Sequence, residues 1–237
     1  MNTLKIISLS ICIFLQLRGM IYSQSKINFF EINLCAIQPE GAFKKNNPSI
    51  NPGVEIAYLR QLKADNPLFW GLSFYYTQLG NSRATLEEFL DFALVNFDYS
   101  TTSHLMGLNG KFRFYPNIYL GRLEPYIEAQ LGYKWLYTGT TKILATDNES
   151  SDFMIENSSF SLSYGIAAGL NFRIKDNIYI NFRANYMPGL STSYYAKDKH
   201  NQIEFSSIDQ FNIKNSTTDI LKWDLGVTFW PSFHAND

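Results

Sequence analysis

The sequence contains few residues that could form disulfides, bind metals or catalyse reactions. Of its 237 residues, two are cysteines and three are histidines. Cys12 lies in an N-terminal apolar run, so export would leave Cys35 alone, and an intrachain disulfide would then be excluded. The 20 Lys and Arg residues are balanced by 21 Asp and Glu residues and are scattered along the chain. This pattern disfavours a nucleic-acid surface, which needs clustered basic residues.

Long apolar runs are absent after the first two dozen residues. The run Ile6–Leu17 follows Lys5 and precedes a plausible cleavage point at Ser23. This arrangement predicts a signal peptide at residues 1–23, followed by a single domain at 24–237. No later segment reaches the ~18 consecutive apolar residues of a transmembrane helix. The chain is therefore expected to be either a secreted soluble β protein or a β-barrel in an outer membrane.

The sequence is instead rich in strict alternation between apolar and polar residues. The clearest example is Phe160–Tyr186, where apolar residues occupy every even position up to Phe172. Turn-type residues follow at 175–177, and the alternation restarts at Ile178. A period of two on both sides of a tight connection predicts a β-hairpin with one apolar and one polar face.

The same period recurs in six other segments and predicts eight strands. They span residues 27–36, 53–61, 69–79, 104–115, 125–137, 160–173, 178–186 and 220–230. Short links at 62–68, 116–124 and 175–177 alternate with long links at 37–52, 80–103, 138–158 and 187–219. Short turns at one end and long loops at the other are typical of outer-membrane barrels. The predicted fold class is all-β: an eight-stranded antiparallel up-and-down transmembrane β-barrel.

The alternative is a soluble barrel of the lipocalin type, with the apolar face turned inward. Several predicted strands reach ~11 residues, the length that a tilted strand needs to cross a bilayer. Trp70, Trp135 and Trp223 fall near strand ends on the apolar face, where an interface aromatic girdle belongs. The polar faces combine Gly and Ser with charged residues, as a crowded lumen would. These features favour the membrane barrel.

The polar faces predict a network of charges in the lumen. An eight-stranded barrel is only wide enough for side chains to fill it, and buried charges must be paired. A salt-bridged plug is the favoured interpretation, and a narrow ion path is the alternative. The predicted lumen charges are Glu31, Glu55, Lys111, Arg113, Glu128, Lys134, Arg173, Arg183, Lys222 and Asp224.

Catalytic and metal-binding patterns are weak. The three histidines, His104, His200 and His234, form no recognisable triad with a nucleophile. We therefore predict no enzyme, no cofactor and no metal site. One long link does carry a pattern: Thr85 and Glu88 read as a capping box, and apolar residues at helical spacing follow to Leu94. They predict a short amphipathic helix, with an extension of the flanking strands as the alternative.

Three stretches resemble a known family. They are PYIEAQLGYKW at Pro125–Trp135, SLSYGIAAGLNFRI at Ser161–Ile174 and WDLGVTFW at Trp223–Trp230. These resemble the outer membrane protein β-barrel domain proteins of Bacteroidetes-type bacteria, which are small eight-stranded barrels of the OmpA/OmpX architecture. The resemblance implies export, residence in the bacterial outer membrane, contact with its lipid and delivery by the barrel insertion machinery. The chain departs from the usual aromatic ending because it continues through Pro231–Asp237.

These observations favour a monomeric, non-catalytic scaffold at the cell surface. Its long loops would be exposed and would bind an extracellular partner. A narrow porin-like transport path for small solutes is the second hypothesis. An outer-membrane lipid-modifying enzyme is the third.

Overall fold

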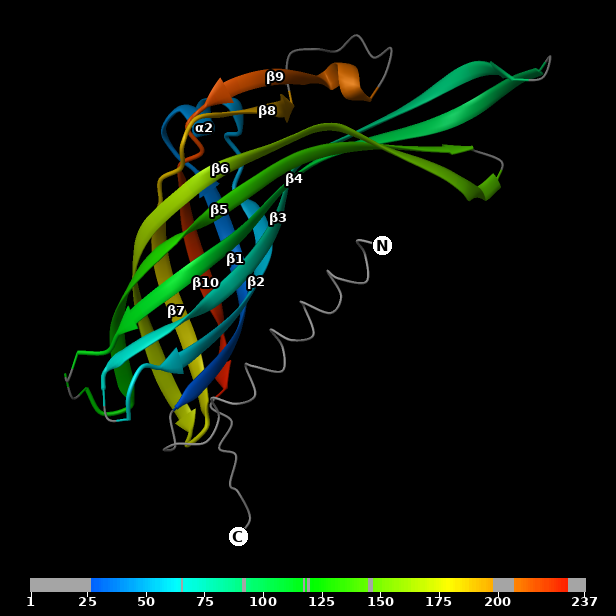
Figure 1. Cartoon of the computed structure of the whole chain (residues 1–237). Coiled ribbons are helices and arrows are strands. Elements are labelled where there is room, and N and C mark those ends of the chain that lie inside the picture. The colour runs from blue at the N-terminus through cyan, green and yellow to red at the C-terminus, as the bar shows by residue number, and fades with distance from the viewer. Residues whose placement is uncertain are drawn as a thin grey trace, which may run out of the picture.

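The computed structural model describes residues 27–64, 66–90, 93–116, 118, 120–144, 147–197 and 207–229. The predicted signal peptide lies outside these residues. Within them the chain forms ten strands, one short helix and one 3-10 turn (Figure 1). The elements are β1 (Asn28–Pro39), α2 (Gly41–Asn46), β2 (Asn51–Gln61), β3 (Leu68–Leu90), β4 (Ala93–Phe114), β5 (Leu123–Leu144), β6 (Asp147–Lys175), β7 (Ile178–Met187), β8 (Thr192–Lys197), η1 (Ile208–Gln210), β9 (Phe211–Ser216) and β10 (Ile220–Phe229).

Eight of the strands close into a barrel in the order β1-β10-β7-β6-β5-β4-β3-β2. Every neighbouring pair is antiparallel, and the barrel closes where β1 meets β10, with Phe30 opposite Phe229. Closure pairs both edges of the sheet, so the barrel wall has no open edge. The predicted eight-stranded up-and-down barrel is confirmed.

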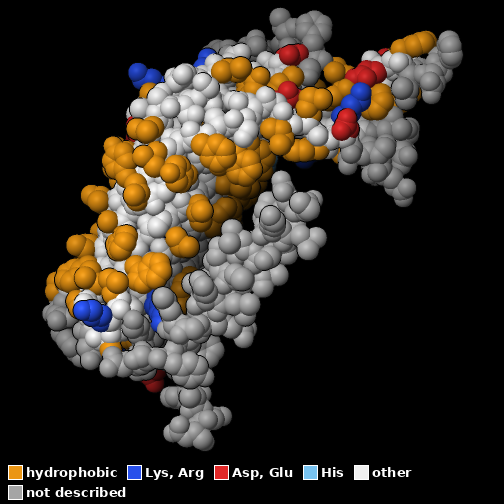
Figure 2. All heavy atoms as spheres, in the orientation of Figure 1, with side chains coloured by type: hydrophobic (Ala, Val, Ile, Leu, Met, Phe, Trp, Pro, Cys, Tyr) orange, Lys and Arg blue, Asp and Glu red, His pale blue; other side chains and the backbone are white. Residues whose placement is uncertain are grey.

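The two faces of the wall follow the period of two. Along β1, Glu31 and Asn33 are buried in the lumen, whereas Ile32 and Leu34 are exposed on the outer wall. The same holds on β6, where Ile166 is 72% exposed. Figure 2 shows apolar side chains spread over the wall that faces the viewer. A polar interior and an apolar exterior are the reverse of a lipocalin-type barrel.

Strands β3 to β6 continue far beyond the barrel as a four-stranded arm (Figure 1). The β3–β4 pairing runs from Leu68 opposite Phe114 out to Leu90 opposite Ala93. The sequence predicted loops at 80–103 and 138–158, and this prediction is wrong for most of both segments. The predicted helix near Thr85 is also wrong, because the described residues there lie in β3 and β4. Ladder bonds carried outward from the barrel override the weak local helical pattern.

The other two long links fold over the mouth of the barrel at the same end as the arm. The link between β1 and β2 contains α2, and the link between β7 and β10 contains the β8–β9 hairpin and η1. We call this the arm end, and the opposite end, with the three short turns, the turn end. Asn28 and Phe229 both lie at the turn end. Among the described residues, no helix is long and apolar enough to cross a membrane.

Candidate functional site: a closed lumen beneath a projecting arm

The centre of the lumen holds a balanced set of charged side chains. Four carboxylates and four cations, all with fully buried side chains, point inward from six strands because each occupies an inward position of the alternation. The formal charges therefore cancel. We call this set the ion network: Glu31, Glu55, Glu128 and Asp224 with Lys111, Arg113, Arg183 and Lys222.

Arg183 is the hub of the ion network because it contacts all four carboxylates. Its guanidinium lies 2.7 Å from Asp224 Oδ2, 3.4 Å from Glu128 Oε1 and 3.5 Å from Glu31 Oε2. It also pairs with Glu55. A planar guanidinium with five donors suits this role better than an ammonium would.

The remaining cations join carboxylates on different strands. Arg113 Nε donates to Glu128 Oε2 at 2.8 Å, and Arg113 Nη2 donates to Glu31 Oε2 at 3.0 Å. Lys111 Nζ lies 2.7 Å from Glu55 and 3.5 Å from Glu128. Lys222 contacts Glu55 and Asp224. Since each buried charge has at least two partners of opposite sign, the network spans the lumen as a cross-braced plug.

An apolar cluster seals the lumen between the ion network and the arm end. Phe43 of α2 packs edge-on against Tyr194 of β8, with ring centroids 5.1 Å apart. The hydrophobic members of this seal are Cys35, Ile37, Phe43, Tyr75, Leu79, Leu105, Leu136, Met187, Tyr194, Ala196 and Ile220. An ion crossing the barrel would therefore meet both a layer of paired charges and a layer of buried apolar side chains.

Two predicted lumen charges lie outside the ion network. Lys134 is buried, but its ammonium donates to the backbone carbonyls of Met187 (2.7 Å) and Thr218 (2.5 Å). Lys134 therefore bonds the backbone at the start of the β7–β8 connection and in the β9–β10 connection, and it does not pair with a carboxylate of the ion network. Arg173 lies at the turn-end rim, half-exposed, where it pairs with Glu124. The alternation assigns Arg173 to the inward-facing positions of β6, but it does not indicate how far along the barrel axis the residue lies.

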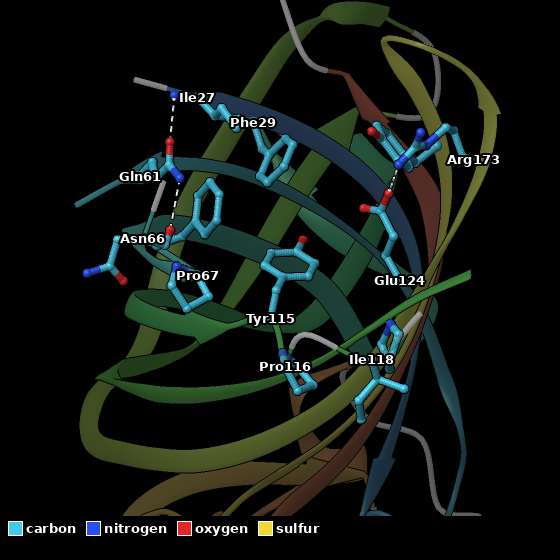
Figure 3. Close-up of a pocket in the computed structure, with 13 residues that line it drawn as sticks. Ile27, Phe29, Gln61, Asn66, Pro67, Tyr115, Pro116, Ile118, Glu124 and Arg173 are labelled. Carbon is cyan, nitrogen blue, oxygen red and sulfur yellow. Dashed lines mark hydrogen bonds and ion pairs between the residues drawn. The ribbon is translucent and has the colours of Figure 1, made fainter. Parts of the chain in front are cut away.

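The turn end opens into an aromatic cup of about 350 Å³ that the sequence did not reveal (Figure 3). Phe29 and Phe69 stack at a centroid distance of 4.9 Å. Tyr115 closes the floor, since its hydroxyl accepts bonds from Asn171 Nδ2 at 2.9 Å and Arg113 Nη1 at 3.2 Å. Gln61 joins two parts of the wall of the cup. Its Oε1 accepts a hydrogen bond from Ile27 N, and its Nε2 donates one to the Asn66 carbonyl. The cup ends on the ion network and does not lead through it.

The three predicted girdle tryptophans all lie on the outer wall. Trp70 lies near the turn end of β3, opposite Phe112. Trp223 lies nearer the arm end of β10, opposite Ala36. Trp135 stacks on Phe160 at 5.7 Å. Its indole N–H donates to Ser158 Oγ at 2.8 Å, which gives the ring an apolar body and a polar tip.

His104 belongs to the same outer row of aromatics. Its Nδ1 lies 2.8 Å from Tyr76 Oη, and its ring stacks on Tyr137 at 4.6 Å. In the described part of the chain, no hydroxyl nucleophile stands in hydrogen-bond contact with it other than this tyrosine. The same residues contain no group of three or more His, Cys, Asp or Glu able to hold a metal ion.

The lumen-side face of the arm is held by a small cluster around Lys142. Its ammonium lies 2.7 Å from Glu88 Oε2 and 4.0 Å from the centroid of the Phe97 ring. The bond from Lys142 lowers the pKa of Glu88, and the same bond raises the pKa of Lys142. Tyr99 also donates to Glu88, and burial raises the pKa of this phenol. These contacts join β3, β4 and β5 well beyond the barrel.

No family model and no curated protein matches the chain. Among solved structures, a major outer membrane protein from Thermus thermophilus aligns with a TM-score of 0.50 and 11% identity, covering 88% of this chain and all of that one. Neisserial surface protein A (0.43, 10%, covering 87% and 99%) and the N-terminal barrel domain of Pseudomonas aeruginosa OprF (0.38, 16%, covering 87% and 100%) also align, at scores too low to support an argument. The chain therefore has an outer-membrane barrel fold.

Proposed function

We propose that the chain is a non-catalytic outer-membrane barrel that anchors an interaction arm at the cell surface. The turn end faces the periplasm and the arm end faces the exterior. The apolar outer wall contacts outer-membrane lipid, and the barrel insertion machinery delivers the chain. The arm, supported by the β8–β9 hairpin, binds a macromolecular partner outside the cell.

One observation carries this proposal: the lumen is closed while the strands of its wall continue outward. The ion network is neutral and cross-braced, and the apolar cluster lies between it and the arm end. A barrel with no solute path is left with its outer surfaces as the site of function. Among these surfaces, the arm formed by β3 to β6 projects far beyond the barrel (Figure 1).

The aromatic cup at the turn end is the one observation that favours the porin-like alternative. It offers an entrance for small solutes, but its floor is Tyr115 bonded to the ion network. Transport would require Arg113 and Arg183 to release their carboxylates together. Such a motion would expose several buried charges at once, which is costly.

Location is tested first. The mature protein should remain with outer-membrane fractions after alkaline washing, because the apolar wall would be exposed in water. Recovery mainly in the soluble periplasm or the medium would contradict the proposal. Conductance is tested next in planar bilayers, where the purified barrel should show no steady open state, and steady ion flow would favour the channel.

Binding is tested with photo-crosslinkers on intact cells. A crosslinker at Phe89, an exposed arm residue, should capture macromolecules that an identical crosslinker at Ile166 on the barrel wall does not. Deletion of residues 84–99, which removes Phe89, should abolish binding of the captured macromolecule to intact cells while leaving the barrel folded, because Arg83 lies directly opposite Ser100 and a tight turn can join them. Equal capture from both positions would contradict an interaction arm.

A further inference from the structure

The outer half of β3 is an open sheet edge. β3 pairs with β2 only as far as Thr77, which lies opposite Gly53, whereas its pairing with β4 continues to Leu90. Beyond the irregularity at Gln78–Gly80, no strand in the described part of the chain pairs with β3 on the side away from β4. An open edge carries N–H and C=O groups that can bond another strand.

The backbone groups available at this edge belong to alternate residues. The Asn81 carbonyl accepts a bond from Lys197 Nζ at 2.7 Å, so it is directed away from the β3–β4 ladder. Residues of a strand alternate in the edge toward which they direct their backbone groups. Arg83, Thr85 and Glu87 therefore share the direction of Asn81.

The side chains of these residues are arranged symmetrically about Thr85. Arg83 lies two residues before it and Glu87 two residues after it, and all three side chains are exposed on one face of the arm. Within the described residues, neither Arg83 nor Glu87 has an ion-pair partner. If a second β3 edge approaches antiparallel with Thr85 opposite Thr85, each Arg83 faces a Glu87 of the other copy. Opposite charges directly across an antiparallel pair are favourable.

Neighbouring registers lack this match. A pairing centred on Glu87 or on Arg83 sets like charges opposite each other, which is unfavourable. A pairing centred on Ala84 or on Leu86 leaves both charged residues opposite uncharged ones. Charges on an edge strand usually prevent association. Here they disfavour the registers centred on Arg83 and Glu87, and among the registers compared only the one centred on Thr85 places opposite charges across the pair.

We propose that two copies of this chain associate through the outer edge of β3. The pair is symmetric, is centred on Thr85 and is held by backbone bonds and two Arg83–Glu87 ion pairs. It joins the two four-stranded arms into one continuous sheet, with each copy presenting the same patch. The sequence led us to expect a monomer, and this proposal replaces that expectation. It rests on the proposed function only in requiring the arm to stand outside the membrane.

A single cysteine at the symmetry centre tests the register. Directly opposed residues in an antiparallel pair have Cα atoms about 4.5–5.5 Å apart, within reach of a disulfide. Thr85→Cys, in a Cys35→Ser background and folded in dilute lipid vesicles, should form a covalent dimer on mild oxidation. Asn96→Cys is the matched control, because it is exposed on β4, one strand away from the edge. Equal crosslinking of the two variants would overturn the proposal.

Charge exchange tests the two ion pairs. Arg83→Glu or Glu87→Arg should each reduce Thr85→Cys crosslinking at least about tenfold, and the double exchange should restore it. A mixture of the two single variants should form heterodimers, since one then carries two acids and the other two bases. Failure of the double exchange to restore dimers would reject the pairing.

The outcomes separate this proposal from the proposed function. Absence of crosslinks at Thr85, with arm-specific capture at Phe89 intact, removes the dimer and leaves the interaction arm. Recovery of the protein in the soluble fraction, or steady conductance, would contradict the proposed function regardless of the crosslinking result for Thr85→Cys. Apart from the shared Cys35→Ser background, which lies in the buried seal, all variants lie on the exposed arm, and heat-dependent gel mobility of the barrel verifies that each one has folded.

Discussion

Removal of Arg183 is the most direct test of the closed lumen. Arg183→Met keeps an unbranched, flexible side chain but removes the guanidinium and its charge, which leaves four buried carboxylates facing three cations. Breaking a buried ion pair from one side costs about 3–5 kcal/mol, because a charge is left uncompensated. Arg183 contacts all four carboxylates, so we expect the upper end of this range.

Glu128→Gln provides the opposite change. Glu128 contacts Lys111, Arg113 and Arg183, yet each of these cations keeps another carboxylate partner. We therefore expect a loss near the lower end of the same range, about 3 kcal/mol. The double variant restores neutrality with three charges of each sign. It should be more stable than the sum of the single losses predicts, by about 2–3 kcal/mol, which is the scale of coupling between residues in one network.

The measurement is the free energy of unfolding in urea, followed by tryptophan fluorescence in phospholipid vesicles. Arg173→Met is the matched control, since it makes the same substitution at the half-exposed rim, where an ion pair is worth no more than about 1 kcal/mol. If Arg183→Met and Arg173→Met lose similar amounts, water must solvate the lumen charges. The closed-lumen argument would then be refuted and an aqueous path favoured.

Three further outcomes are expected. Lys134→Met should expose the β7–β10 connection to protease, because Thr218 loses its charged donor, and hydrogen bonds to charged groups are worth about 1.5–3 kcal/mol; unchanged cleavage would contradict this. Ile166→Arg should impair folding into vesicles by about 2–4 kcal/mol if the residue faces the membrane midplane, and normal insertion would count against that placement. Gly107→Ala should cost about 1–3 kcal/mol in urea unfolding, since its Cβ would lie 2.0 Å from the Tyr75 ring; a neutral result would mean that this ring can shift.

The barrel could be predicted from the sequence because the pattern that specifies it lies within each strand, between neighbouring residues. A period of two assigns each residue to a face, and burial in a membrane barrel depends first on that face. Glu31 and Ile32 are neighbours in the chain, yet one is buried in the lumen and the other lies on the outer wall. The eight strands and the inward direction of the ion network followed from this pattern alone.

The partners of the charges could not be predicted in the same way. Which side chains meet across a lumen depends on the stagger of the strands, and this is a property of the closed barrel. Arg183 and Arg173 lie on neighbouring strands with the same parity, but one is the hub of the network and the other lies at the rim. Lys134 bonds two carbonyls from remote connections, which no local pattern could indicate.

The arm was missed for a related reason. Residues 81–90 combine a weak alternation with a capping-box pattern, so local propensity is divided between helix and strand. The pairing of β3 with β4 begins in the barrel wall and adds one ladder position after another without a new loop closure. Extending an existing ladder costs less chain entropy than starting a helix, whose first turn is unfavourable.

This continuity links the membrane wall to the arm. The strands that form one side of the barrel are the strands of the arm, and Lys142, Glu88 and Tyr99 keep β3, β4 and β5 joined beyond it. The direction of the arm is therefore set by the barrel, which the ion network braces from within. The closed lumen and the direction of the arm therefore depend on the same packing, because the strands of the arm continue those of the barrel wall. Loosening the lumen by removing Arg183 should for this reason also weaken the arm-edge crosslink at Thr85, although the two sites share no contact.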